Sequence, residues 1–128
     1  MGTTITFKNL TIGYRSKHQL RAVASSIHAP LQEDKLTCLI GANGVGKSTL
    51  LRTLSGFQPP LDGEILIQDK PLSDYSAREL AQEIGVVLTN RMDTPQLSVQ
   101  EIIGIGRSPY TGFWGTLSSA DQKIVDEA

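Results

Sequence analysis

Hydrophobic and polar residues alternate in some parts of this chain and form continuous apolar runs in others, which together predict an α/β fold. Thr4–Leu10 and Glu64–Gln68 alternate with a period of two, as strands with one buried face do. Leu20–Ile27 is expected to be a further strand. Leu36–Ile40 and Ile84–Leu88 are continuously apolar, as strands buried inside a parallel sheet are. The alternating strands predict a small antiparallel layer beside the buried ones.

Several segments carry helix signals. A helix is expected over Ser48–Leu54, ending at Gly56, because glycine suits a left-handed C-cap. A serine followed three residues later by an acidic residue predicts a capping box at a helix start. Three such pairs occur: Ser76 with Glu79, Ser98 with Glu101, and Ser118 with Asp121. The last helix reaches Ala128 without a stop signal, so the chain is expected to end within an element. Loops are expected at residues 12–17 and 30–34.

The amino-acid composition says more about the possible binding partners of the chain than about its fold. The chain has 128 residues, 39% of them hydrophobic and 20% charged, which is typical of one small globular domain. Its net charge of −1 gives no basic surface for nucleic acid, so neither DNA nor RNA is expected as a partner. No apolar run is long enough to cross a bilayer and no signal peptide is visible, so a soluble chain is expected. Cys38 is expected to be a buried, inert thiol, and His18 and His28 lack further ligands at zinc spacing.

The clearest chemical signal lies between the apolar run 36–40 and the helix that follows. It consists of Gly41, Ala42, Asn43, Gly44, Val45, Gly46, Lys47, Ser48 and Thr49. Glycines let the backbone form a concave nest of N–H groups at a helix N-terminus, which attracts phosphate. Lys47 is expected to reach the terminal phosphates, and the Ser48 hydroxyl to bind Mg²⁺.

The ligand expected from these nine residues, called the P-loop below, is ATP or GTP with Mg²⁺. The plainer alternative is a glycine-rich turn with a solvated lysine. The predicted order of strand, loop and helix favours the phosphate-binding interpretation.

The order of motifs resembles the nucleotide-binding subunit of an ABC transporter, over the whole chain but only the first half of that family's domain. Three features carry this resemblance: Asn43-Gly44 in the loop, residues 48–51 after it, and the proline-rich turn Pro59–Leu66. It implies the P-loop NTPase fold of an ABC ATPase, with an antiparallel β layer and the start of a helical subdomain. Residues 1 to about 90 would form the β layer and core, and about 91–128 the beginning of the helical subdomain.

Tyr14 lies in the expected loop after the first strand, where the family has an aromatic residue that stacks on adenine. On its own, a tyrosine at a loop edge is more often a half-buried surface residue. With the resemblance, Tyr14 is interpreted as the adenine-binding residue, which selects ATP.

Thr89 is a departure from the family pattern. The family has a glutamine after the strand that corresponds to Ile84–Leu88, where it contacts Mg²⁺ and the attacking water. Here the position is Thr89, followed by Asn90. Either the Thr89 hydroxyl could contact a Mg²⁺-bound water, or Asn90 could supply the amide.

The segment Gly106–Tyr110 resembles the Gly-Arg-x-Pro-aromatic run of ATPases that serve iron-siderophore, haem and cobalamin importers. The structural alternative is that Tyr110, Phe113 and Trp114 pack into a helical core. Both interpretations are kept, because a run of residues can indicate ancestry without touching a ligand.

The resemblance implies an ATP-binding subunit that pairs with a second copy and with integral membrane permease subunits at the cytoplasmic face of the cell membrane. An external substrate-binding protein would be an indirect partner. The family's signature and catalytic acidic residue have no match here, since Leu54–Gly56 and Leu117–Ser119 lack the signature's form. The chain alone is therefore expected to bind ATP weakly and not to hydrolyse it. The alternatives are a non-transporter ABC ATPase and a non-catalytic nucleotide-binding or interaction module.

Overall fold

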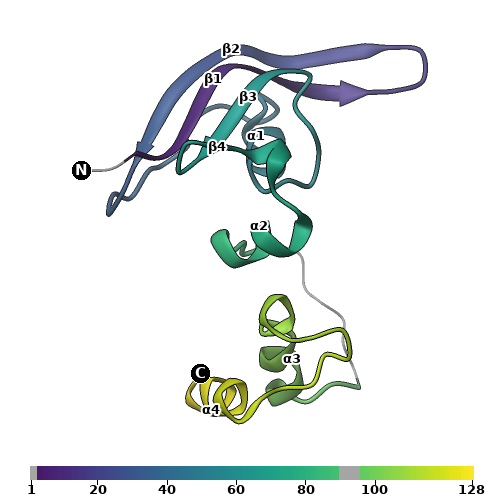
Figure 1. Cartoon of the computed structure of the whole chain (residues 1–128). Helices are drawn as coiled ribbons and strands as arrows, with labels where there is room; N and C mark the ends of the chain where they lie inside the picture. The colour runs from purple at the N-terminus through teal and green to yellow at the C-terminus, as the bar shows by residue number, and fades with distance from the viewer. Residues whose placement is uncertain (1–2, 90–95) are drawn as a thin grey trace. The chain divides into compact units, whose positions relative to one another are not determined.

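The computed structural model describes residues 3–89 and 96–128 (Figure 1). The chain divides between Ser76 and Ala77 into two compact units. The first holds the sheet and the P-loop helix, and the second holds short helices.

The first unit is built on a four-stranded antiparallel sheet with the order β2-β1-β3-β4. Its strands are β1 Thr3–Arg15, β2 Leu20–Gln32, β3 Asp62–Ile67 and β4 Lys70–Pro71. This confirms the predicted antiparallel layer. Figure 1 shows β1 and β2 as a long pair.

Strands β1 and β2 are longer than predicted, because β1 has hydrogen-bonded neighbours on both sides. The expected loop from residue 12 is wrong as far as Arg15, since β1 continues to that residue and Ile12 is buried in it. The turn expected from Pro30 begins later than predicted, because β2 runs to Gln32 and the turn is formed by residues 33–34. Pro30 faces Thr6 and is tolerated because β2 lies at the sheet edge, where a missing N–H donor costs little.

The core of this unit lies between the sheet and helix α1, Lys47–Leu54. Phe7, Leu10, Ile12 and Ile65 are buried, and Leu50 and Leu54 from α1 pack against them. This packing fixes the P-loop helix to one face of the sheet.

Helix α1 ends at Leu54, and Gly56 follows it as the predicted left-handed glycine, with a φ of 74°. The Gly56 N–H donates to the Thr53 carbonyl at 3.1 Å, and the Phe57 N–H donates to the Arg52 carbonyl at 2.9 Å. These two bonds form a Schellman motif, in which glycine supplies the left-handed residue.

The two predicted parallel strands are not formed. Leu36–Ile40 has no strand structure, and Leu36 and Ile40 are 93% and 90% exposed. Ile84–Leu88 likewise has none, and Val87 is 99% exposed. A strand of a parallel sheet needs a paired neighbour and cover on both faces, and the described residues provide neither for these runs. The prediction of a buried Cys38 is wrong for the same reason, because its thiol is exposed.

The second unit contains the helices α2 Ala77–Glu83, α3 Val99–Ile105 and α4 Ser119–Glu127, after the 3₁₀ turn η1 Leu72–Asp74 of the first unit. A further 3₁₀ turn, η2 Ser108–Tyr110, follows α3. The predicted capping boxes of Ser98 with Glu101 and of Ser118 with Asp121 are confirmed. The box of Ser76 with Glu79 stays a prediction.

Candidate functional site

The P-loop enters helix α1 through two glycines in the left-handed region. Gly44 has a φ of 81°, and Gly46, the N-cap of α1, has a φ of 110°. Residues other than glycine adopt such angles at a cost of about 1–2 kcal/mol. The two glycines therefore account for the sharp turn that directs the loop into the helix.

The N-terminus of α1 is open to an anion. No side chain from the described part of the chain caps it, and its first turn holds no acidic residue. The first N–H groups of a helix have no partner within the helix, and the helix dipole makes this end positive. The local backbone and charge therefore suit phosphate.

Lys47 is held over the loop by carbonyl groups. Its Nζ donates to the Gly41 carbonyl oxygen at 2.8 Å and to the Ala42 carbonyl oxygen at 2.7 Å. The ammonium thus lies against the P-loop backbone, and it can exchange these neutral acceptors for phosphate oxygens without crossing the fold. Ser48 is exposed on the first turn of α1.

Tyr14 is tied directly to the P-loop helix. Its hydroxyl lies 3.0 Å from Thr49 Oγ1, and the Thr49 side chain is buried on the first turn of α1. Tyr14 belongs to β1, near its end, and is 52% exposed. The structure therefore brings Tyr14 and the P-loop together while leaving part of the Tyr14 side chain accessible.

The residue before Tyr14 is fixed as well. Gln58 Nε2, from the segment after α1, donates to the Gly13 carbonyl oxygen at 3.1 Å. A Cβ at Gly13 would overlap the Arg21 carbonyl oxygen on the neighbouring strand. Sequence reasoning missed Gln58, because no local pattern marks a side chain that bonds a backbone group 45 residues away.

Thr89 lies in the second unit and is exposed, whereas Tyr14 and the P-loop lie in the first. Asn90, the alternative amide, lies outside the described residues. A contact of either residue with Mg²⁺ or water stays a prediction.

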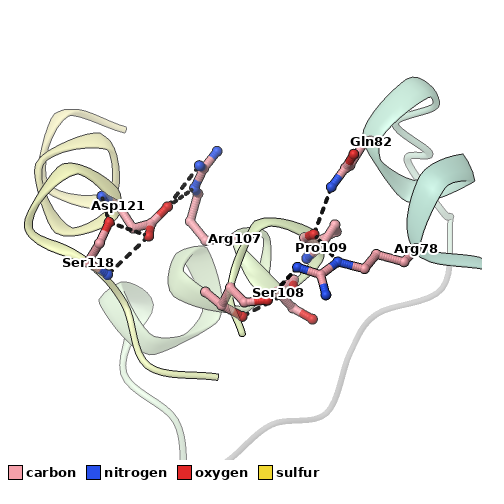
Figure 2. Close-up of polar contacts among 8 residues, drawn as sticks. Arg78, Gln82, Arg107, Ser108, Pro109, Ser118 and Asp121 are labelled. Carbon is pink, nitrogen blue, oxygen red and sulfur yellow. Dashed lines mark hydrogen bonds and ion pairs between the residues drawn. The ribbon is translucent and has the colours of Figure 1, made fainter. Parts of the chain in front are cut away.

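The Gly106–Tyr110 segment forms polar contacts within the second unit (Figure 2). Arg107 pairs with Asp121, with Nη2 at 2.8 Å from Oδ1, and its guanidinium lies 4.1 Å from the centre of the Tyr110 ring. Hydrogen bonds lower the pKa of Asp121 from 3.8 to about 2, and the bond from the Ser118 hydroxyl has a larger effect than the bond from Arg107. The arginine of this segment thus connects it to the start of α4.

Side chains of helix α2 also donate hydrogen bonds to the end of this segment and to the residue that follows it. Arg78 Nε and Gln82 Nε2 each donate to the Pro109 carbonyl oxygen at 2.8 Å, and Arg78 Nη2 donates to the Thr111 carbonyl oxygen at 2.7 Å (Figure 2). Sequence reasoning missed both side chains, since neither stands out in the helix pattern.

The structural alternative, in which the aromatic residues pack into a helical core, is wrong for Phe113 and Trp114. Phe113 and Trp114 are 94% and 87% exposed and form an edge-to-face pair with each other, and Tyr110 is 49% exposed. Polar contacts to backbone carbonyls, rather than aromatic burial, hold this segment. An open pocket of about 630 Å³ lies beside it, lined by residues of α3 and α4 that include Gly104 and Val125, and by Leu117.

Residues 24–128 match the protein family described as ABC transporter. The chain is 41% identical over 118 residues to an uncharacterized ABC transporter ATP-binding protein of Haemophilus influenzae, covering 92% of the chain and 43% of the relative. It is 32% identical over 121 residues to the ferric enterobactin transport ATP-binding protein of Escherichia coli, covering 94% and 43%. The chain thus spans less than half the length of these relatives.

A solved structure supports the same fold. An ATP-binding cassette, captured as a dimer in a post-hydrolysis state with ADP and Pi, superimposes with a TM-score of 0.73 at 24% identity. The match covers 96% of this chain and 54% of that one. Together with the family match, it confirms the predicted fold class.

Proposed function

This chain belongs to the ABC transporter family, and we propose that it is part of the ATP-binding subunit of an importer for metal chelates of the iron-siderophore, haem or cobalamin type. The observation that carries the proposal is the P-loop geometry: two left-handed glycines lead into an uncapped helix N-terminus beside a lysine. The names of relatives such as the ferric enterobactin protein support the substrate class.

Each residue of the site has a role in binding MgATP. The N–H groups of the loop and of the first turn of α1 would hold the phosphates, and Lys47 would leave the Gly41 and Ala42 carbonyls to bind the terminal phosphates. Ser48, exposed on that turn, would bind Mg²⁺ through its hydroxyl. Tyr14 would stack on adenine, and Thr89 would contact a Mg²⁺-bound water.

The proposed partners are integral membrane permease subunits, a second ATP-binding subunit and, indirectly, an external substrate-binding protein. The proposed location is the cytoplasmic face of the cell membrane. The part of the chain that the structure describes contains no helix long and apolar enough to cross a membrane. We further propose that residues 1 to about 90 and about 91–128 correspond to the core and the start of the helical subdomain.

Isothermal titration of the intact chain with ATP and with GTP, in the presence of Mg²⁺, tests this function. We expect ATP to bind more tightly than GTP, and Lys47→Ala to weaken ATP binding at least tenfold. Lys123→Ala, which removes an exposed lysine on α4, is the matched control and should leave the affinity unchanged. A folded chain that shows no heat of binding with either nucleotide would contradict the proposal.

A further inference from the structure

Two hydrogen bonds from the P-loop side of the molecule converge on neighbouring residues at the end of β1. Thr49, on the first turn of α1, meets the Tyr14 hydroxyl at 3.0 Å. Gln58, just after α1, donates to the Gly13 carbonyl oxygen at 3.1 Å. Both bonds cross from the helical side to the strand and fix its last residues relative to the P-loop.

Thr49 is buried on the first turn of α1. Its side chain is only 5% exposed, and its own carbonyl oxygen accepts a bond from Thr53 Oγ1 at 2.8 Å, one turn later in α1. Thr53 is fully buried. Because Thr49 sits on a packed helix, its hydroxyl is a rigid anchor for the Tyr14 hydroxyl.

The close approach of neighbouring atoms at Gly13 also restricts strand β1. A Cβ there would overlap the Arg21 carbonyl oxygen and would approach Leu61 Cδ1 to 2.8 Å. There is therefore no space for a side chain at Gly13 beside β2, and Gln58 bonds its carbonyl oxygen. Tyr14 is thus anchored at both its backbone and its hydroxyl, while about half of the residue remains exposed.

We propose that Thr49 and Gln58 are positioning residues that fix the Tyr14 ring beside the P-loop before the nucleotide arrives. The inference rests on the proposed ATP-binding function and gives the Thr49 side chain a role toward the base, in addition to the role of the P-loop backbone toward the phosphates. If the ring is already anchored, nucleotide binding does not have to immobilise the Tyr14 side chain. The free energy saved corresponds to roughly a 2- to 12-fold gain in affinity.

A double-mutant cycle tests the inference on the intact chain. MgATP is titrated into the wild type, Thr49→Val, Tyr14→Phe and the double variant, with inorganic tripolyphosphate as the base-free probe. We expect each single variant to bind ATP roughly 2- to 12-fold more weakly and the double variant to lose no more than either one. The loss for tripolyphosphate should be smaller than for ATP. Thr49→Ser, which keeps the hydroxyl, should restore affinity.

Gln58→Met provides an independent arm, because it removes the donor to Gly13 and leaves α1 and Tyr14 unchanged. It should weaken ATP binding more than tripolyphosphate binding, even if Thr49→Val fails to fold. Equal losses for the two ligands, or additive losses in the cycle, would overturn the positioning role alone. A folded wild-type chain that binds neither ligand would overturn the proposed function as well.

Discussion

Arg107 places two guanidinium nitrogens on one oxygen of Asp121, with Nε at 2.9 Å and Nη2 at 2.8 Å from Oδ1. The other oxygen, Oδ2, accepts bonds from the Ser118 hydroxyl at 2.6 Å and the Ser118 backbone N–H at 3.0 Å. One carboxylate thus completes the capping box of α4, whose N-cap is Ser118, and pairs with the arginine of the Gly106–Tyr110 segment. The segment that suggests an importer ATPase from its sequence is a structural connection in the folded chain.

The stability supplied by Asp121 should depend on pH. Because hydrogen bonds from Ser118 and Arg107 lower its pKa to about 2, the folded state favours the ionised carboxylate. This contribution is present above its ordinary pKa of 3.8 and is lost as pH falls toward 2. We expect Asp121→Asn to lower the melting temperature at pH 7, and the difference from wild type to shrink between pH 4 and pH 2.

Circular dichroism melts of both proteins at pH 7, 4 and 3 measure this difference. The pKa of Glu101 is also lowered, mainly by the Ser98 hydroxyl, but Glu101 is present in both proteins and cancels in the comparison. A difference between the two melting temperatures that does not change with pH would contradict the assignment.

Removing the Arg78 side chain should loosen η2 more than removing that of Gln82. Arg78 bonds both the Pro109 and the Thr111 carbonyls, whereas Gln82 bonds only the first. In Gln82→Ala the Pro109 carbonyl keeps a donor, but in Arg78→Ala the Thr111 carbonyl loses the Arg78 bond. Hydrogen exchange of the Tyr110 and Thr111 amides should show local opening easier by about 1 kcal/mol in Arg78→Ala. Similar exchange in both variants would contradict this ranking.

Features set by neighbouring residues were predicted more completely from the sequence than features set by distant residues. The capping boxes at Ser98 and Ser118 and the glycine at the end of α1 depend on residues within one turn, and they were correct. The strand prediction for Leu36–Ile40 failed, because an apolar run becomes a strand only when another segment pairs with it.

In the candidate functional site too, neighbouring residues were easier to predict from the sequence than contacts between distant residues. The P-loop residues are contiguous, so the sequence indicated them all together. The contact between Tyr14 and Thr49 joins residues 35 positions apart, and that between Gln58 and Gly13 spans 45. Neither distance leaves a periodic or spacing signal, and only the folded sheet and helix bring these side chains together.

The intact chain should hydrolyse ATP no faster than background. Phosphoryl transfer needs several elements placed around the phosphates at once, and the family's signature and catalytic acidic residue have no match in this sequence. Phosphate release should therefore be the same in wild type and Lys47→Ala, although ATP binding differs. A Mg²⁺-dependent rate that Lys47→Ala abolishes would overturn this expectation.

Gly46→Ala should destabilise the first unit more than Gly44→Ala. Both glycines have a positive φ, so alanine costs about 1–2 kcal/mol of backbone strain at either position. At Gly44 nothing lies within 4 Å of an added Cβ, whereas at Gly46 the Cβ would approach Val23 Cγ1 on β2 to 2.6 Å. This overlap adds about 1–3 kcal/mol, because the loop must then move away from the sheet.

Urea unfolding of the two variants and the wild type measures the two costs, and Gly44→Ala is the matched control for strain without overlap. We expect the unfolding midpoint to fall in both variants and to fall further in Gly46→Ala. If the midpoints of the two variants agree, the P-loop does not pack against Val23 as the structure shows. A larger fall in Gly46→Ala instead establishes that the sheet, through β2, holds the phosphate-binding loop in place.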